Sequence, residues 1–212
     1  MATSAAHISN RIDLADRVTL ARDLIPKNPT FERWGLDALA GRLVELNGGA
    51  ETATLTLAAS LVVATQHRRG LVAWVTIPGS EFFPPDFAAA GIDLNALPIV
   101  RVPNGRASAK AADILLRSRA FSLIVLDITT LRDLPLSIQT QLTGLAKSTN
   151  TTVLCITHQS ETPGSLVSFR GRTRKSRTGH DCFTCEIETL KDKRNPPGGV
   201  HQELCHGADG LC

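Results

Sequence analysis

The sequence predicts an α/β fold built on a mostly parallel central sheet. Short apolar runs alternate with amphipathic stretches of roughly 10 to 15 residues, the pattern of strands joined by helices. The run at 121–127 is almost wholly apolar, as buried parallel strands are. After His158 the pattern changes, because two strand-like stretches, 166–174 and 183–190, are joined by a polar turn. We expect these two stretches to extend the sheet in antiparallel fashion.

The first half of the chain supplies two strands and two helices. Residues 43–46 are a short apolar run that leads into glycines, and residues 52–66 repeat Leu, Ala and Val at helical spacing. The run at 71–77 predicts a second strand, which the Pro-Gly pair after it ends. Residues 87–91 predict a short helix that ends at its glycine.

The second half repeats this alternation with clearer signals. Residues 99–102 predict the third strand, and residues 108–118 predict a helix with alanine and aliphatic side chains on one face. The fourth strand, 121–127, is followed by a helix at 136–148 and a fifth strand at 152–157. Such βαβ units bring successive strands into one parallel sheet.

The chain divides by composition into one core and two appendages. With 212 residues and 42% hydrophobic content, we expect one medium-sized core domain, residues 31–200. Residues 201–212 show little periodicity and predict a flexible tail. Residues 1–30 predict a helix and a proline-containing linker, and this helix either packs on its own core or docks on a partner. Its apolar face is formed by Ile12, Ala15, Val18 and Leu24.

Composition also excludes several classes of protein. Aromatic residues make up only 4% of the chain and Tyr is absent, which argues against a stacking surface for single-stranded nucleic acid. No apolar run reaches about 18 residues, so we expect no membrane span, and the first ten residues lack the features of a signal peptide. Five cysteines fit a reduced, cytoplasmic protein.

A strand, a glycine loop and a helix form the frame of a phosphate-binding loop at 43–66. A working loop also needs a lysine for the phosphates and a Ser or Thr for the metal. No lysine lies between Glu45 and Ala64, and Glu51 puts a negative charge where a phosphate would lie. We therefore expect no bound cofactor, or at most weak ATP binding, at a degenerate site. Its candidate residues are Gly48, Gly49, Thr52, Thr54 and the strand-end Asp127.

Basic residues gather in the expected antiparallel strands. They predict either a surface that contacts DNA or a partner, or an edge strand protected by charge. Glu186 and Glu188 share a face of the next strand and are expected to pair with these arginines. The basic residues of this region are Arg170, Arg172, Arg174, Lys175, Arg177, Lys191 and Lys193.

Cysteines and histidines near the end of the chain have some features of a zinc site. Cys182 and Cys185 have a suitable spacing, and His180, His201, His206, Cys205 and Cys212 are nearby in sequence. However, positions three apart on a strand point to opposite faces. We therefore expect no metal site, and thiols without a ligand role.

Several segments, taken in order, carry a resemblance to a known family. They are 41–46 with the glycine loop after it, 54–57, 91–97, 123–127, 154–159, and 190–193 with Pro196-Pro197-Gly198. In this order and spacing, over roughly residues 33–200, they resemble the P-loop NTPase core of the RecA recombinase family. The short length, residues 164–168 and the Lys191-Asp192-Lys193 ending are similar to the ImuA (SulA- or RecA-like) group.

The resemblance implies a RecA-like core with a degenerate Walker A loop. It also implies an accessory role in SOS-induced translesion synthesis, through contacts with RecA, an ImuB-like Y-family protein and an error-prone polymerase. The alternative is a RecA paralogue that binds ATP and DNA weakly. In RecA filaments, the pair that matches Lys191 and Lys193 reaches the neighbouring subunit's nucleotide; here they contact a partner RecA or are two solvated lysines.

RecA-type ATPases provide four functional parts, of which this chain keeps two. They need the loop Lys and Thr, a carboxylate after the second strand, the Asp that ends the Walker B strand, and a polar sensor after the fifth strand. The lysine is missing and no carboxylate follows the second strand before Glu81, whereas Asp127 and a sensor candidate, His158 or Gln159, are present. We therefore expect no ATP hydrolysis, and Asp127 either keeps its old role or caps the loop that follows it.

Overall fold

The structure is a computed structural model that describes residues 34–48, 53–80, 82–158, 165–179, 182–196 and 198–206. All of these residues belong to one compact unit, Phe31–Cys212. The helix predicted within residues 1–30, with Ile12, Ala15, Val18 and Leu24, lies outside the described residues.

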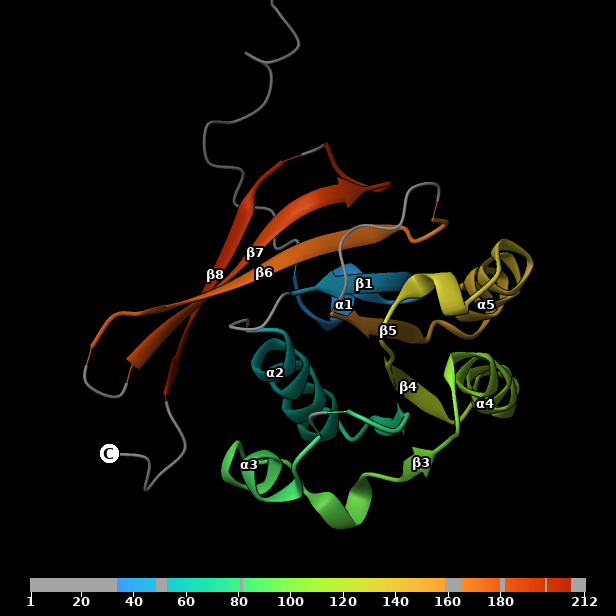
Figure 1. Cartoon of the computed structure of the whole chain (residues 1–212), viewed down its shortest axis with the longest axis horizontal. Helices are drawn as coiled ribbons and strands as arrows, with labels where there is room; N and C mark the ends of the chain where they lie inside the picture. The colour runs from blue at the N-terminus through green and yellow to red at the C-terminus, as the bar shows by residue number, and fades with distance from the viewer. Residues whose placement is uncertain are drawn as a thin grey trace, which may run out of the picture. The chain divides into compact units, whose positions relative to one another are not determined.

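The described residues form an eight-stranded sheet with the order β3-β2-β4-β5-β1-β6-β7-β8 (Figure 1). All pairs from β3 to β6 are parallel, and β6–β7 and β7–β8 are antiparallel. The predicted mixed α/β fold with a mostly parallel sheet is confirmed. The strands are β1 (Leu43–Asn47), β2 (Leu71–Thr76), β3 (Ile99–Arg101), β4 (Phe121–Asp127), β5 (Thr152–Thr157), β6 (Phe169–Arg177), β7 (Cys182–Asp192) and β8 (Val200–His206).

Helices cover both faces of the sheet (Figure 1). β4 shows how one buried strand serves two cores, because Leu123 and Val125 pack with α2 while Ile124 and Leu126 pack with α4 and α5. This alternation explains why the strand is apolar at every central position. The helices are α1 (Leu36–Leu39), α2 (Thr54–His67), α3 (Pro84–Ala89), α4 (Gly105–Ser118) and α5 (Leu136–Thr149), with 3-10 turns at Leu94–Ala96 and Leu131–Asp133.

The end of the chain differs from the prediction. Residues 201–212 were expected to form a flexible tail, but β8 pairs with β7 from Val200 to His206, so this prediction was wrong for residues 201–206. The remaining residues, 207–212, lie outside the described part of the chain. β8 escaped detection because neither of its faces is uniformly apolar: Gln202 and the apolar Leu204 are exposed on one face, and Glu203 is half-buried on the other. The main-chain ladder with β7, rather than an apolar face, defines this strand.

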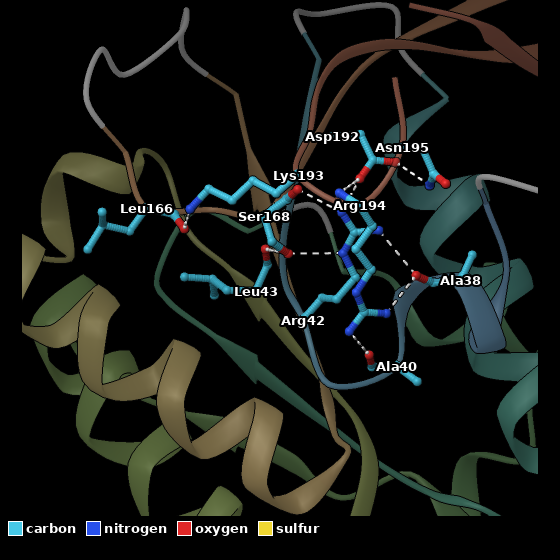
Figure 2. Close-up of polar contacts among 10 residues, drawn as sticks. All are labelled: Ala38, Ala40, Arg42, Leu43, Leu166, Ser168, Asp192, Lys193, Arg194 and Asn195. Atoms are coloured by element: carbon cyan, nitrogen blue, oxygen red, sulfur yellow. Dashed lines mark hydrogen bonds and ion pairs between the residues drawn. The ribbon is translucent and has the colours of Figure 1, made fainter. Parts of the chain in front are cut away.

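A buried arginine fastens the start of β1 to the neighbouring strands (Figure 2). Arg42, whose side chain is 1% exposed, pairs at 2.5 Å with Asp192 at the end of β7. It also donates to the carbonyl of Ser168 at 2.7 Å and to the Ser168 hydroxyl at 3.0 Å. Burial raises the pKa of Asp192, but hydrogen bonds from Asn195, the Arg194 amide and Arg42 outweigh it and hold the pKa below its usual value.

Within the described ranges, no helix is both long enough and apolar enough to cross a lipid bilayer.

Candidate functional site

The carboxyl ends of the parallel strands meet at one edge of the sheet, where ligands bind in open α/β folds. In the ladder, Asn47 of β1 lies beside Thr157 of β5, and Asp127 of β4 lies beside Ile156 and Thr76. The sequence placed the degenerate nucleotide site at this edge. Asp127 and Gly48 both lie here, at the ends of β4 and β1, so the fold brings these two predicted residues to the same edge.

Two polar groups at the described ends of the loop after β1 are engaged by the sheet itself. The Gly48 amide donates to the carbonyl of Thr157 at 3.1 Å and so continues the ladder. Thr54, at the start of α2, is 2% exposed, and its hydroxyl shares a 2.7 Å hydrogen bond with the hydroxyl of Thr173 in β6. The other two predicted loop residues, Gly49 and Thr52, lie outside the described residues.

Asp127 is the meeting point of three strand ends. Its side chain is 2% exposed and accepts a hydrogen bond from the hydroxyl of Ser80, in the loop after β2. Nε2 of His158, which follows β5, lies 3.7 Å from Oδ1 of Asp127. Asp127 was expected either to serve a nucleotide or to cap the loop after its own strand. In the structure it fixes the loop after β2, a role that sequence reasoning missed because Ser80 lies 47 positions away, and its role toward a nucleotide stays a prediction.

This trio is not arranged as a hydrolytic triad. In a triad the serine donates to the histidine, which donates to the aspartate, whereas Ser80 donates to the carboxylate itself. The position after β2 where an ATPase carries its carboxylate is occupied by Ile77 and Pro78. The cluster is therefore an anchor for the loop, with a half-exposed imidazole at its edge.

Arg170, predicted to contact DNA or a partner, lies in a buried ion pair instead. Its side chain is 10% exposed and its Nε lies 2.5 Å from Oε2 of Glu45 in β1. The guanidinium also donates to the hydroxyl of Ser165 at 2.5 Å. Thr157 donates to the other oxygen of Glu45 at 3.2 Å, so the carboxylate is well satisfied. The prediction was wrong for Arg170, because the residue opposite it in the parallel ladder is Glu45.

The remaining basic residues of β6 are at the surface. Arg172 and Arg174 lie 3.6 and 3.3 Å from Glu188, with side chains 41% and 62% exposed. The expected pairing of these arginines with Glu188 is confirmed, whereas Glu186 accepts a hydrogen bond from Gln202 of β8.

The end of this strand is also occupied by local contacts. Lys175 lies 4.0 Å from the ring centroid of Phe183, and Nε of Arg177 donates to the carbonyl of Gly179 at 3.1 Å. Both side chains belong to exposed residues, so they can still present positive charge to solvent.

Lys191 and Lys193 hold the segment that precedes β6. Nζ of Lys191 donates to the carbonyl of Ser165 at 2.9 Å. Nζ of Lys193 donates to the carbonyl of Leu166 at 3.2 Å (Figure 2). Burial lowers the pKa of Lys191, and the nearby charges of Lys193 and Arg170 lower it further. The two lysines therefore have a structural role in this chain, and a role toward a partner remains a proposal.

Of the zinc candidates, Cys182 and Cys185 lie on β7 and Cys205 lies on β8, but they gather no metal ligands in the part of the chain that the structure describes. Cys185 of β7 is buried, and its thiol is hydrogen-bonded to that of Cys205 in β8. Burial and this bond raise the pKa of Cys185 to about 12. His180, Cys212 and the side chain of His206 lie outside the described residues.

Comparison with known proteins identifies the relatives of this core. No model of a known protein family matches the chain. Over 183 residues it is 28% identical to Protein RecA of Kineococcus radiotolerans, covering 74% of this chain and 52% of that protein. Over 191 residues it is 26% identical to Protein RecA of Leptospira meyeri, covering 75% and 47%. This chain is similar to RecA.

A shorter stretch is more alike: 88 residues are 35% identical to Protein RecA of a Nocardioides species, covering 41% of this chain and 25% of that protein. The chain spans about half the length of the first two RecA proteins. These similarities support the RecA-like family expected from the order of the sequence motifs.

Proposed function

We propose that this chain is a RecA-like adaptor that acts in SOS-induced translesion synthesis without hydrolysing ATP. In this role it binds RecA and an ImuB-like Y-family protein, and so links the damage response to an error-prone polymerase. It works in the cytoplasm, at the nucleoid. The similarity to RecA over about three quarters of the chain supports a surface shaped like that of a RecA subunit.

The observation that carries the non-catalytic part of the proposal is the state of Thr54 and its loop. The loop after β1 has no lysine, and the Thr54 hydroxyl is buried and hydrogen-bonded to Thr173 instead of being presented to a metal. A charge-assisted contact of the missing kind contributes about 1.5–3 kcal/mol, or one to two decades of affinity. The carboxylate expected after β2 is also replaced, by Pro78 and its neighbours.

Two measurements on the purified protein test the proposal. The first is ATP hydrolysis with and without single-stranded DNA, for the unaltered chain and for Asp127→Ala. DNA-dependent hydrolysis that disappears in Asp127→Ala would sink the non-catalytic proposal. The second is calorimetric binding to RecA from the same host, with the full chain and with residues 31–212 alone. Binding that requires residues 1–30 assigns the docking arm, and no binding at micromolar concentrations refutes the adaptor.

A second candidate is a RecA paralogue that binds DNA weakly, and the exposed arginines of β6 favour it. Arg174 is 62% exposed and pairs only loosely with Glu188. DNA binding through such residues weakens steeply with salt, because each phosphate contact releases counterions. Arg174→Ala should then weaken DNA binding and reduce the salt slope, whereas an adaptor without DNA contact would leave both unchanged.

A further inference from the structure

A cavity opens at the carboxyl ends of β2 and β3, beside the anchored loop after β2. Its volume is about 450 Å³, within the range of roughly 300–1,000 Å³ typical of ligand pockets. The adaptor role proposed above does not use it, and no described residue of the loop after β1 lines it. The residues that matter for its chemistry are Pro78, Ser80, Phe82, Arg101, Val102 and Pro103.

The wall of the cavity is held in place from behind. The ring of Phe82 lies 5.3 Å from that of Trp74 and 4.4 Å from that of Phe87, centroid to centroid. The amide of Phe82 donates to the Ser80 hydroxyl at 3.1 Å, and Ser80 in turn donates to the buried Asp127. A wall fixed in this way loses little conformational entropy when a ligand binds.

Among the described residues that line the cavity, the wall is mostly apolar and carries one cation. Pro78, Phe82, Val102 and Pro103 supply apolar surface, and Arg101 supplies a guanidinium. Arg101 is exposed and, within the described part of the chain, has no acidic partner. One cation complements one negative charge, so the wall suits a group that combines an apolar body with a carboxylate.

The surroundings fit a protein ligand better than a small molecule. Phe83, next to the cavity wall, leaves 57% of its surface exposed and so adds apolar area beside the hollow. Arginine and aromatic residues are the types most enriched at protein interfaces and their energetic centres. Both types are present here, around a hollow that an apolar side chain can enter.

We propose that this cavity docks an extended segment of a partner protein in which a large apolar residue adjoins an acidic one. The apolar side chain enters between Phe82 and Pro103, and the carboxylate pairs with Arg101. This inference rests on the proposed function, since an adaptor needs a surface that recognises a partner. It names the chemistry of that partner, and it is independent of the β6 arginines and of residues 1–30.

The test uses the full chain and three end-blocked peptides. Each peptide has a central phenylalanine flanked on both sides by the same residue, with glycines beyond. The flanking residues are aspartates in the first peptide, asparagines in the second and lysines in the third. Arg101→Gln and Arg101→Glu remove and reverse the cavity's charge. Arg132→Gln is the matched control, because Arg132 is also exposed but does not line the cavity. Binding is followed by calorimetry, with phenylacetate as a small-molecule probe.

The proposal expects the aspartate peptide to bind the unaltered chain and the Arg132→Gln control equally. Arg101→Gln should weaken this binding about 10- to 100-fold. Arg101→Glu should then prefer the lysine peptide.

Three results would overturn the proposal: no binding of the aspartate peptide at millimolar concentration, equal binding of the asparagine peptide, or no effect of Arg101→Gln. Equal binding of phenylacetate and peptide would assign the cavity to a small organic anion instead. Binding of RecA to the unaltered chain is measured alongside. It tests the adaptor role separately, because its result does not depend on whether any peptide binds.

Discussion

Replacing Asp192 by alanine should destabilise the protein by about 3–5 kcal/mol, because it leaves a charged arginine buried without its counter-ion. The pair is fully enclosed: the side chains of Arg42 and Asp192 are 1% and 0% exposed. After the change, Arg42 keeps its bonds to Ser168 and to the carbonyl of Ala38, but these neutral acceptors do not balance its charge. For a chain of this size, each kcal/mol corresponds to about 2–4 °C, so Tm should fall by about 6–20 °C.

The assay is urea unfolding followed by circular dichroism, with the midpoint and the slope fitted for each variant. Asp113→Ala is the matched control, because Asp113 also pairs with an arginine, Arg117, at 2.8 Å but on an exposed helix surface. Surface pairs of this kind contribute about 0–1 kcal/mol. If Asp192→Ala lost no more stability than Asp113→Ala at an unchanged slope, the buried pair would not fasten β1 to β7.

Three further predictions concern buried groups. The pKa of Asp192 in the folded protein lies below its ordinary value of 3.8. The stability that the ionised Asp192 contributes is therefore complete above pH 3.8 and is lost as the pH falls through the folded-state pKa. The urea midpoint should drop in acid, and this drop should be smaller in Asp192→Asn. Arg170→Met should cost about 3–5 kcal/mol in the same assay by leaving Glu45 unpaired, and a loss below 1 kcal/mol would contradict the burial of that pair. Burial raises the pKa values of Cys155 and Cys185, so mass spectrometry should find both thiols unmodified by iodoacetamide at pH 8 until urea unfolds the protein.

The sequence predicts strands well where burial leaves a periodic trace. The run at 121–127 coincides with β4, because both faces of this strand are covered and every central residue must be apolar. Its position in the sheet could not be predicted in this way. The order that places β1 between β5 and β6 depends on contacts across more than 100 positions, and hydrophobic periodicity carries no information on them.

The basic strand shows the same limit at the level of single side chains. Arg170 and Arg174 belong to the same alternating run of arginines and have similar neighbours in the sequence, yet Arg170 is buried and Arg174 is exposed. The difference is made by Glu45, which the parallel pairing of β1 with β6 brings opposite Arg170. Whether an arginine in an alternating basic run lies at the surface therefore depends on which residue lies beside it in the sheet, and the local sequence does not specify that residue.

The central position of β1 also constrains how the chain can be made. Of the described strands, β1 is the first to leave the ribosome, but its neighbours β5 and β6 are the last of the parallel strands, and its fastening residue Asp192 lies 150 positions beyond Arg42. At about 5–20 residues per second, roughly 8–30 s of synthesis separate the two residues. For most of that interval, until β5 is made, an apolar strand has no partner on either edge, so the growing chain depends on shielding from other chains until β5 and β6 can pair with β1.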